Sequence, residues 1–193
     1  MYGNPFTYFS SISTAANDGW VLESIVTSHT GGSMSASGTL RIGDDASNRQ
    51  YLSILSFTTS AIPDNAVIHS VTLKLHKAGV VSTDPLTINS IGSFLVDMKK
   101  GTFGAAALEN GDFQAAASVN AVAHFSSIGK GWYQLVLPAS DFTYVNLGGI
   151  TQFRLRFTSP SNFNLSANYD TFYAGDATAS ADRPVLTVDY HLP

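Results

Sequence analysis

The apolar stretches of this chain are short, rich in β-branched and aromatic residues, and bounded by Gly, Pro, Asn, Asp or Ser. Such runs are typical of β-strands separated by turns, because branched and aromatic side chains fit a pleated surface while the bounding residues fit turns. We therefore predict about ten strands. They are expected at residues 6–12, 20–27, 39–42, 51–58, 67–77, 93–98, 132–137, 152–158, 169–173 and 185–191.

Two of these runs, at residues 71–76 and 153–157, alternate between apolar and polar side chains. Successive side chains of a strand point to opposite faces, so each run has one buried and one wet face. This alternation is typical of antiparallel sheets, since parallel sheets covered on both faces give continuous apolar runs. The sequence therefore predicts an all-β, antiparallel fold. The residues expected to fill its core are Val71, Leu73, Leu75, Phe153, Leu155 and Phe157, with Leu55 and Phe57 opposite them.

Helix is expected at only two places, both as decorations on loops. Residues 112–119 can form a short helix with Asp112 as its cap, and residues 140–145 can form a single turn. No repeat or linker divides the chain, so we expect one domain over residues 1–193. The aromatic segment at residues 1–14 is expected to be an edge strand, either in this molecule or exchanged with a neighbour.

Charge and composition exclude several classes of function. Lys and Arg number 10 against 14 Asp and Glu, a net charge of −4, which does not favour binding to nucleic acid. No apolar run approaches the ~20 residues of a membrane span. The absence of cysteine removes disulfides, thiolate metal sites and cysteine nucleophiles. The first six residues lack the basic and apolar regions of a secretion signal, so an exported form would carry Met1 in place of a removed leader or an excised domain.

The usual catalytic patterns are also missing. The five histidines form no HxxxH, HxH or HExxH arrangement, and the chain has no Gly-x-Ser-x-Gly elbow or phosphate-binding glycine loop. Paired carboxylates for glycoside chemistry depend on separation in space rather than in sequence, but most acidic residues here occupy turn positions. We therefore expect a protein without catalytic activity.

Three acidic clusters have the composition of an oxygen-ligand site. Calcium takes six to eight oxygens from carboxylates and backbone carbonyls, and loops in which Asp lies beside Gly supply both. Ordinary turns require the same residues, so turn formation is the alternative. The expected ligands of a structural Ca²⁺ are Asp18, Glu23, Asp44, Asp45 and Asp176.

Five segments of the chain form an ordered set of motifs. They are Asp18-Gly19-Trp20-Val21, Leu40-Arg41-Ile42-Gly43-Asp44-Asp45, Leu55-Ser56-Phe57-Thr58-Thr59-Ser60-Ala61-Ile62-Pro63, Ala66-Val67-Ile68-His69-Ser70-Val71-Thr72-Leu73-Lys74-Leu75 and Arg183-Pro184-Val185-Leu186-Thr187-Val188-Asp189-Tyr190. In this order they resemble successive motifs of the DNRLRE domain family, which overlaps carbohydrate-binding module family 96. The resemblance implies a β-sandwich of jelly-roll type that is exported and non-catalytic, and some members of the family bind acidic polysaccharides such as alginate. The longer middle at residues 92–123 and the aromatic N-terminus depart from the family pattern.

The basic residues of two predicted strands suit such a ligand. Guanidinium groups capture carboxylate or sulfate groups in a bidentate manner, and aromatic rings stack on sugars. We expect the ligand-binding residues to be Lys74, His76, Arg154, Arg156 and Tyr169, with Trp20, Trp132, Tyr133 and Tyr173 as further aromatic candidates, although Trp20 fits the core better. A solvated sheet face is the alternative explanation of the charges.

The sequence leaves two functions open. The first is an extracellular carbohydrate-binding module for an anionic polysaccharide. The second is a structural subunit of a surface layer, adhesin or filament, in which residues 1–12 complete a neighbour's sheet. A crosslink from Lys74 or Lys99 to an asparagine is a third idea, which nothing in the sequence favours over free lysines.

Overall fold

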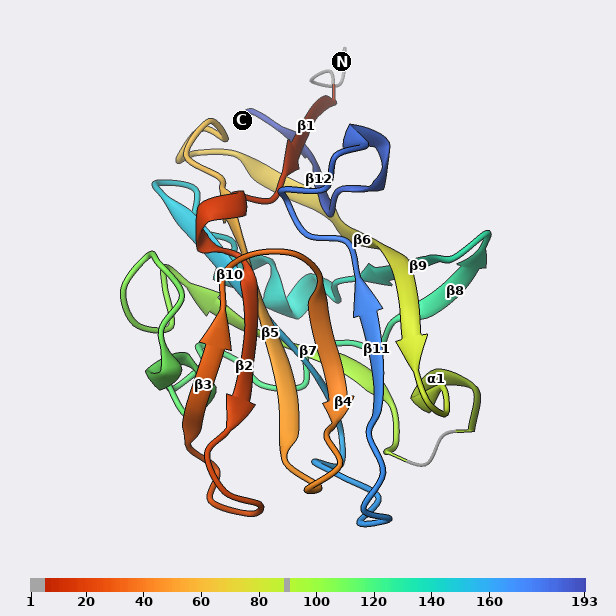
Figure 1. The fold of residues 1–193 in the computed structure, drawn as a ribbon. Helices are drawn as coiled ribbons and strands as arrows, with labels where there is room; N and C mark the ends of the chain where they lie inside the picture. The colour runs from red at the N-terminus through yellow and green to blue at the C-terminus, as the bar shows by residue number, and fades with distance from the viewer. Residues whose placement is uncertain (1–5, 89–90) are drawn as a thin grey trace.

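The structure is a computed structural model that describes residues 6–88 and 91–193. Twelve strands in these residues form an all-β fold in which every strand pair is antiparallel (Figure 1). The strands are β1 (Thr7–Ile12), β2 (Gly19–Glu23), β3 (Gly31–Ser35), β4 (Leu40–Asp44), β5 (Gln50–Thr58), β6 (Val67–Val81), β7 (Phe94–Lys100), β8 (Ser126–Gly129), β9 (Trp132–Val136), β10 (Ile150–Phe157), β11 (Asn168–Phe172) and β12 (Val185–His191). The predicted antiparallel sandwich is confirmed.

The long strand β6 connects the two layers of the sandwich. Its first part pairs with β12 and β9, while residues Lys77 to Val81 pair with β11. The hydrogen-bonded order is β1-β12-β6-β11-β4-β5-β10-β7, with β2 and β3 attached to β5 and with β8 attached to β9. In Figure 1, β3, β2, β5, β4 and β11 run side by side.

The main core lies between these layers and contains every residue that the alternation placed there. All eight predicted core side chains are at most 2% exposed. Leu40, Ile42, Phe94 and Phe172 join them from neighbouring strands. A second, smaller cluster forms on the other side of β5, where Phe103, Leu108 and Phe113 of the long middle segment cover Val21, Leu52 and Ile54.

Helical structure in the described residues consists of short segments of three to six residues. They are η1 (Ala15–Asn17), α1 (Pro85–Ile88), η2 (Asn110–Phe113), η3 (Ala139–Tyr144) and η4 (Ser180–Asp182). The turn predicted at 140–145 is confirmed by η3. The helix predicted at 112–119 is wrong: Asp112 is the third residue of η2, which starts at Asn110 and ends at Phe113, and its Oδ2 accepts the Glu109 N–H at 2.9 Å.

The N-terminal segment lies at the end of the strand order. β1 pairs with β12 of the same chain over six residue pairs, from Thr7 with Tyr190 to Ile12 with Val185. Residues 1–5 of the predicted N-terminal strand lie outside the described residues. The side chains of Phe6 and Tyr8 are 72% and 65% exposed. No helix among the described residues is long and apolar enough to cross a membrane.

Candidate functional site

The four basic residues predicted to bind a ligand lie on two strands that are not neighbours. Lys74 and His76 belong to β6, which pairs with β12, β9 and β11. Arg154 and Arg156 belong to β10, which pairs with β5 and β7. The predicted basic patch is therefore not formed, because β6 and β10 occupy different places in the strand order.

Arg154 is buried rather than exposed. It is only 7% exposed, although its neighbours Phe153 and Leu155 point to the opposite side, into the main core. Its Nε and Nη2 donate to Oδ2 of Asp97 at 3.1 and 3.0 Å. Its Nη1 donates to the main-chain carbonyls of Asp112, Phe113 and Ala115. The prediction that Arg154 binds a ligand is thus corrected. The alternation correctly placed Arg154 on the strand face that points away from the main core, but the long middle segment covers that face.

Arg156 shares the same carboxylate. Its Nε and Nη2 donate to Oδ2 and Oδ1 of Asp97, both at 2.9 Å. Burial alone would raise the pKa of Asp97, but the Arg156 hydrogen bonds and the two guanidinium charges hold it below its usual value. Arg156 also lines a depression of about 410 Å³, together with His29 and Asn120. It remains half-exposed, yet its charge is already paired.

His76 forms part of the framework of β6 and β9. Its ring stacks on Trp132 with a centroid distance of 4.6 Å and an interplanar angle of 3°. Its Nδ1 lies 2.8 Å from Oδ1 of Asp182, and its Nε2 lies 3.1 Å from the carbonyl oxygen of Lys130. Both ring nitrogens therefore have protein partners, which favours a structural role for this histidine.

The five carboxylates predicted to bind calcium do not gather at one point. Residues 6–88 and 91–193 contain no group of three or more His, Asp or Glu side chains arranged to hold a metal. Each predicted ligand instead accepts hydrogen bonds from backbone N–H groups or side chains of the chain itself. The donors are Ser13, Ser56 and Gly175 for Asp18, His29 and Gln50 for Glu23, Ser161 and Asn162 for Asp44, Arg49 for Asp45, and Gly38 for Asp176. Several of these contacts join segments that are distant in the sequence, such as Gly38 with Asp176 and Ser161 with Asp44.

Asp18 is the most strongly perturbed of these groups. It is 1% exposed, and burial raises the pKa of its carboxyl to about 6. The hydrogen bonds from Ser13, Ser56 and Gly175 act in the opposite direction but are weaker than the effect of burial. Asp18 thus joins the N-terminal turn to β5 and to the loop after β11.

A cluster of one arginine and three aromatic rings joins four strands. We call Trp20 of β2, Arg41 of β4, Tyr51 of β5 and Tyr169 of β11 the Arg41 platform. The guanidinium carbon of Arg41 lies 4.6, 5.5 and 5.4 Å from the ring centres of Trp20, Tyr51 and Tyr169. The Tyr51 ring centre lies 5.3 Å from that of Trp20 and 5.0 Å from that of Tyr169. Trp20, Arg41 and Tyr169 are half-buried, so part of each remains open to solvent.

Gly43 lets the platform form. It lies opposite both Tyr51 and Tyr169 in the register of β4 with its neighbours. A Cβ on Gly43 would approach the Asn168 carbonyl oxygen to 2.2 Å and Cα of Tyr169 to 2.7 Å, and its φ is +138°. Only glycine combines that close approach with this backbone conformation. The glycine therefore brings β11 close enough for Tyr169 to meet Arg41.

The Arg41 guanidinium has unused donors. Among the described residues it makes no ion pair with a carboxylate, and its one side-chain hydrogen bond runs from Nη1 to the Tyr51 hydroxyl at 3.3 Å. A guanidinium carries five N–H donors in a planar fork. The backbone of Arg41 is held in place, because Ser53 Oγ accepts a hydrogen bond from the Arg41 N–H and donates one to the Arg41 carbonyl oxygen, both at 2.9 Å. Arg41 is thus a positioned cation with capacity for an anionic ligand.

No family model and no curated protein sequence matches the chain. The resemblance to the DNRLRE domain family therefore rests on the five sequence motifs alone.

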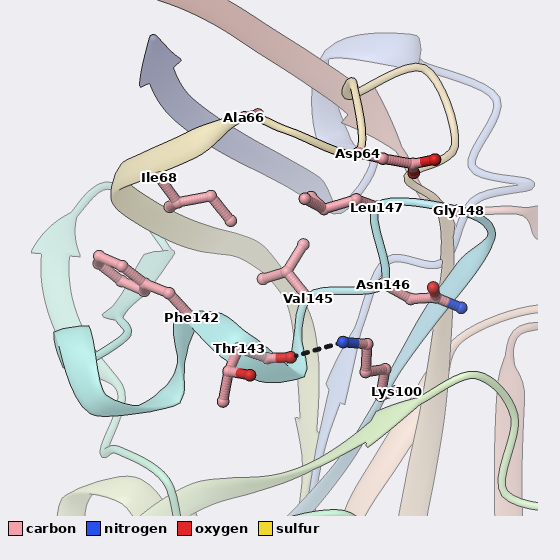
Figure 2. Close-up of a pocket in the computed structure, with 10 residues that line it drawn as sticks. All are labelled: Asp64, Ala66, Ile68, Lys100, Phe142, Thr143, Val145, Asn146, Leu147 and Gly148. Atoms are coloured by element: carbon pink, nitrogen blue, oxygen red, sulfur yellow. Dashed lines mark hydrogen bonds between the residues drawn. The ribbon is translucent and has the colours of Figure 1, made fainter. Parts of the chain in front are cut away.

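A second depression of about 410 Å³ opens beside the turn η3 (Figure 2). Phe142, Ile68, Val145 and Leu147 form its apolar wall, and Lys100 enters from β7. Lys100 Nζ donates to the carbonyl oxygen of Thr143 at 3.0 Å. This contact links β7 to η3, so the one cationic side chain that lines the depression among the described residues already has a partner, and Phe142 is its one aromatic lining residue.

Of the four residues of the Arg41 platform, the sequence predicts Tyr169 and Trp20 as aromatic candidates but not Arg41 or Tyr51. Arg41 lies between two buried neighbours, Leu40 and Ile42, inside a motif that the sequence singled out. That alternation was the available signal for an outward arginine. Nothing in the sequence shows that β2, β5 and β11 bring three rings to it.

Proposed function

We propose that this protein is a non-catalytic carbohydrate-binding module that holds an anionic polysaccharide, such as a uronate polymer of the alginate type, on the Arg41 platform. One observation carries the proposal: a fixed guanidinium lies against three aromatic rings and has no carboxylate partner among the described residues. An extracellular location belongs to the same proposal, since it follows from the family resemblance and from the class of ligand.

The chemistry of the platform fits both parts of a uronate. An aromatic face packs against the C–H groups of a sugar ring, and a guanidinium fork binds a carboxylate through two parallel N–H bonds. Trp20 and Tyr169 supply rings on either side of Arg41, at centroid distances of 4.6 and 5.4 Å from its guanidinium carbon. A neutral polysaccharide would use only the rings. We therefore expect preference for acidic over neutral polymers.

The proposal is tested by affinity electrophoresis in gels that contain alginate, pectate or a neutral glucan. Wild-type protein should be retarded by the acidic polymers, and added salt should weaken retardation because exposed ionic contacts are screened over about 8 Å at physiological ionic strength. Trp20→Ala and Arg41→Ala should each abolish most of the retardation. Lys74→Ala, which removes an equal charge from a different sheet, is the matched control and should behave as wild type.

Failure of wild-type protein to bind any uronate or sulfated polymer would reject the proposal. Retardation that disappears in Lys74→Ala but survives in Arg41→Ala would instead move the site to β6.

A second candidate function rests on β1. This strand lies at the end of the strand order, and Phe6, Tyr8 and Ile12 are 72%, 65% and 46% exposed. An edge strand with exposed aromatic side chains can pair with a copy of itself, as in a surface layer or filament. Light scattering distinguishes the two functions: assembly requires a mass above that of the monomer that falls when residues 1–12 are deleted.

A further inference from the structure

A lysine and an aspartate occupy core-facing positions on neighbouring strands. In β6 the alternate residues Val71, Leu73 and Leu75 are fully buried, and Lys77 is the next residue on the same face of the strand. In β11 the alternate residues Asn168, Asp170 and Phe172 are buried in the same way. Lys77 lies opposite Phe172 in the register of the two strands, two positions from Asp170. Lysine and aspartate side chains are rarely buried unless they are paired.

The two charged groups are in direct contact, and a second carboxyl joins them. Lys77 Nζ lies 2.6 Å from Oδ1 of Asp170 and 2.5 Å from Oδ2 of Asp84, which precedes α1. The Asp170 side chain is fully buried, while those of Lys77 and Asp84 are 15% and 23% exposed. An amine, a carboxyl and a second carboxyl thus meet at one end of the core.

Asp170 is poorly solvated in this position. Although the lysine is at ion-pair distance, neither Asp170 oxygen has a hydrogen-bond partner of good geometry in the described residues. Phe172 lies two residues after Asp170 on β11, on the same face of the strand. Its ring packs edge-on against Tyr133 with a centroid distance of 5.6 Å. A carboxyl in such surroundings favours its neutral form.

The two carboxyls differ in their protonation. Burial raises the pKa of Asp170 to about 6, and repulsion by Asp84 adds to this effect. Burial also acts to raise the pKa of Asp84, but the hydrogen bond and charge of Lys77 hold it below its usual value. Asp170 is therefore the carboxyl that is protonated more readily, and Asp84 is the carboxylate that stays ionised beside the Lys77 ammonium.

We propose that Lys77 and Asp170 join through an intramolecular amide bond that forms in the folded chain. The Asp84 carboxylate takes one proton from the Lys77 ammonium, and the free amine attacks the carboxyl carbon of protonated Asp170. The C–N bond forms, the C–OH bond of Asp170 breaks, and one water leaves. Carboxylic acid, ammonium and carboxylate become amide, water and carboxylic acid, so atoms and charge balance without any co-reactant.

The folded chain supplies the conditions for this reaction. Holding amine and carboxyl in contact replaces an encounter between separate molecules, and it can contribute much of the barrier lowering. The bond would tie β6, which belongs to both layers, to β11. It would not involve the Arg41 platform, so its presence or absence is independent of polysaccharide binding. The lysines considered from sequence are less suited: Lys99 Nζ instead donates to the carbonyl oxygen of Ala116.

The test is the intact mass of the full chain after purification and prolonged incubation. We expect a mass below that of the sequence by one water molecule. Trypsin should then fail to cleave after Lys77, and fragment spectra should show a branched peptide that joins Lys77 to Asp170. Lys77→Arg keeps the positive charge and should restore the full mass, and Lys74→Arg on the same strand is the matched control that should still lose water.

The role of Asp84 is tested separately. Asp84→Asn removes the base, so the loss of water should become much slower or stop while the circular dichroism spectrum remains that of a β protein. Wild-type protein of full mass that trypsin cleaves after Lys77 would overturn the proposal. A branched peptide that joins Lys77 to Asp84 would overturn the assignment of Asp170 as the acceptor.

Discussion

The guanidinium carbon of Arg41 lies 4.6 Å above the ring of Trp20, although β2 and β4 are separated by the intervening strand β3 in the chain. The cation lies over the face of the indole ring, and among the described residues its only side-chain hydrogen bond runs from Nη1 to the Tyr51 hydroxyl. The other N–H donors of Arg41 can therefore serve a ligand that binds beside the rings. Because these donors are free, a single arginine is sufficient for the proposed anion-binding site in a protein with few basic residues.

Arg41→Lys should weaken binding to a uronate polymer about tenfold or more, because a lysine ammonium cannot form two parallel hydrogen bonds to a carboxylate. The measurement is the dissociation constant for an oligouronate at two salt concentrations. The salt dependence should persist, since the charge is conserved. Equal affinity of Arg41→Lys and wild type would show that charge alone, without the guanidinium fork, accounts for binding.

Arg154→Ala should destabilise the fold rather than act on ligand binding. The change leaves Asp97 with one guanidinium and three carbonyl oxygens without their donor, and breaking a buried ion pair costs about 3–5 kcal/mol. Denaturant unfolding measures this loss. Arg156→Ala keeps the buried pair and removes a half-exposed partner, so it should cost clearly less. A stable Arg154→Ala protein that had lost polysaccharide binding would restore Arg154 as a ligand residue.

The fold was largely readable from the sequence because the strands carry their own signals. All ten predicted strands are present, since their branched and aromatic residues alternate or run continuously. The two missed strands, β3 and β8, have the sequences Gly-Gly-Ser-Met-Ser and Ser-Ser-Ile-Gly. These residues have little strand preference of their own, and each segment is extended because it pairs with a neighbour, β2 or β9.

The site was less readable because contacts between distant strands decide it. Alternation correctly turned Arg154 away from the main core, but it does not reveal that a segment about forty residues earlier covers that side. Lys77 is the opposite case. The alternation of Val71, Leu73 and Leu75 is visible in the sequence, and it places Lys77 on the same core-facing side of the strand. Its partner Asp170 is also in a core-facing phase, but the pairing of β6 with β11 is a property of the fold.

Gly43→Ala should destabilise the protein by about 2 kcal/mol or more and separate Tyr169 from Arg41. The added Cβ would collide with the backbone of β11 at 2.2 Å, and the positive φ adds strain of about 1–3 kcal/mol. Denaturant unfolding and oligouronate binding should both be impaired. Gly111→Ala is the matched control, because a Cβ there meets no atom within 4 Å. Unchanged stability of Gly43→Ala would show that β11 moves away readily and that the platform is not held by close approach.

Acidification from about pH 7.5 to about pH 5 should stabilise the fold through Asp18. Its pKa is about 6 in the folded protein against an ordinary value of 3.8, so the folded state holds this proton more tightly than the unfolded state. The resulting stability is fully present below about pH 4 and is lost as the pH rises through about 6, which gives about 1.5 kcal/mol at pH 5 relative to pH 7.5. Asp97 and Asp84, with lowered pKa values, act in the opposite direction, so the comparison is made between wild type and Asp18→Asn. The variant should lose this part of the gain when the free energy of unfolding is measured at both pH values. An identical pH dependence in Asp18→Asn would mean that Asp18 remains ionised in the folded protein and that its three hydrogen bonds outweigh its burial.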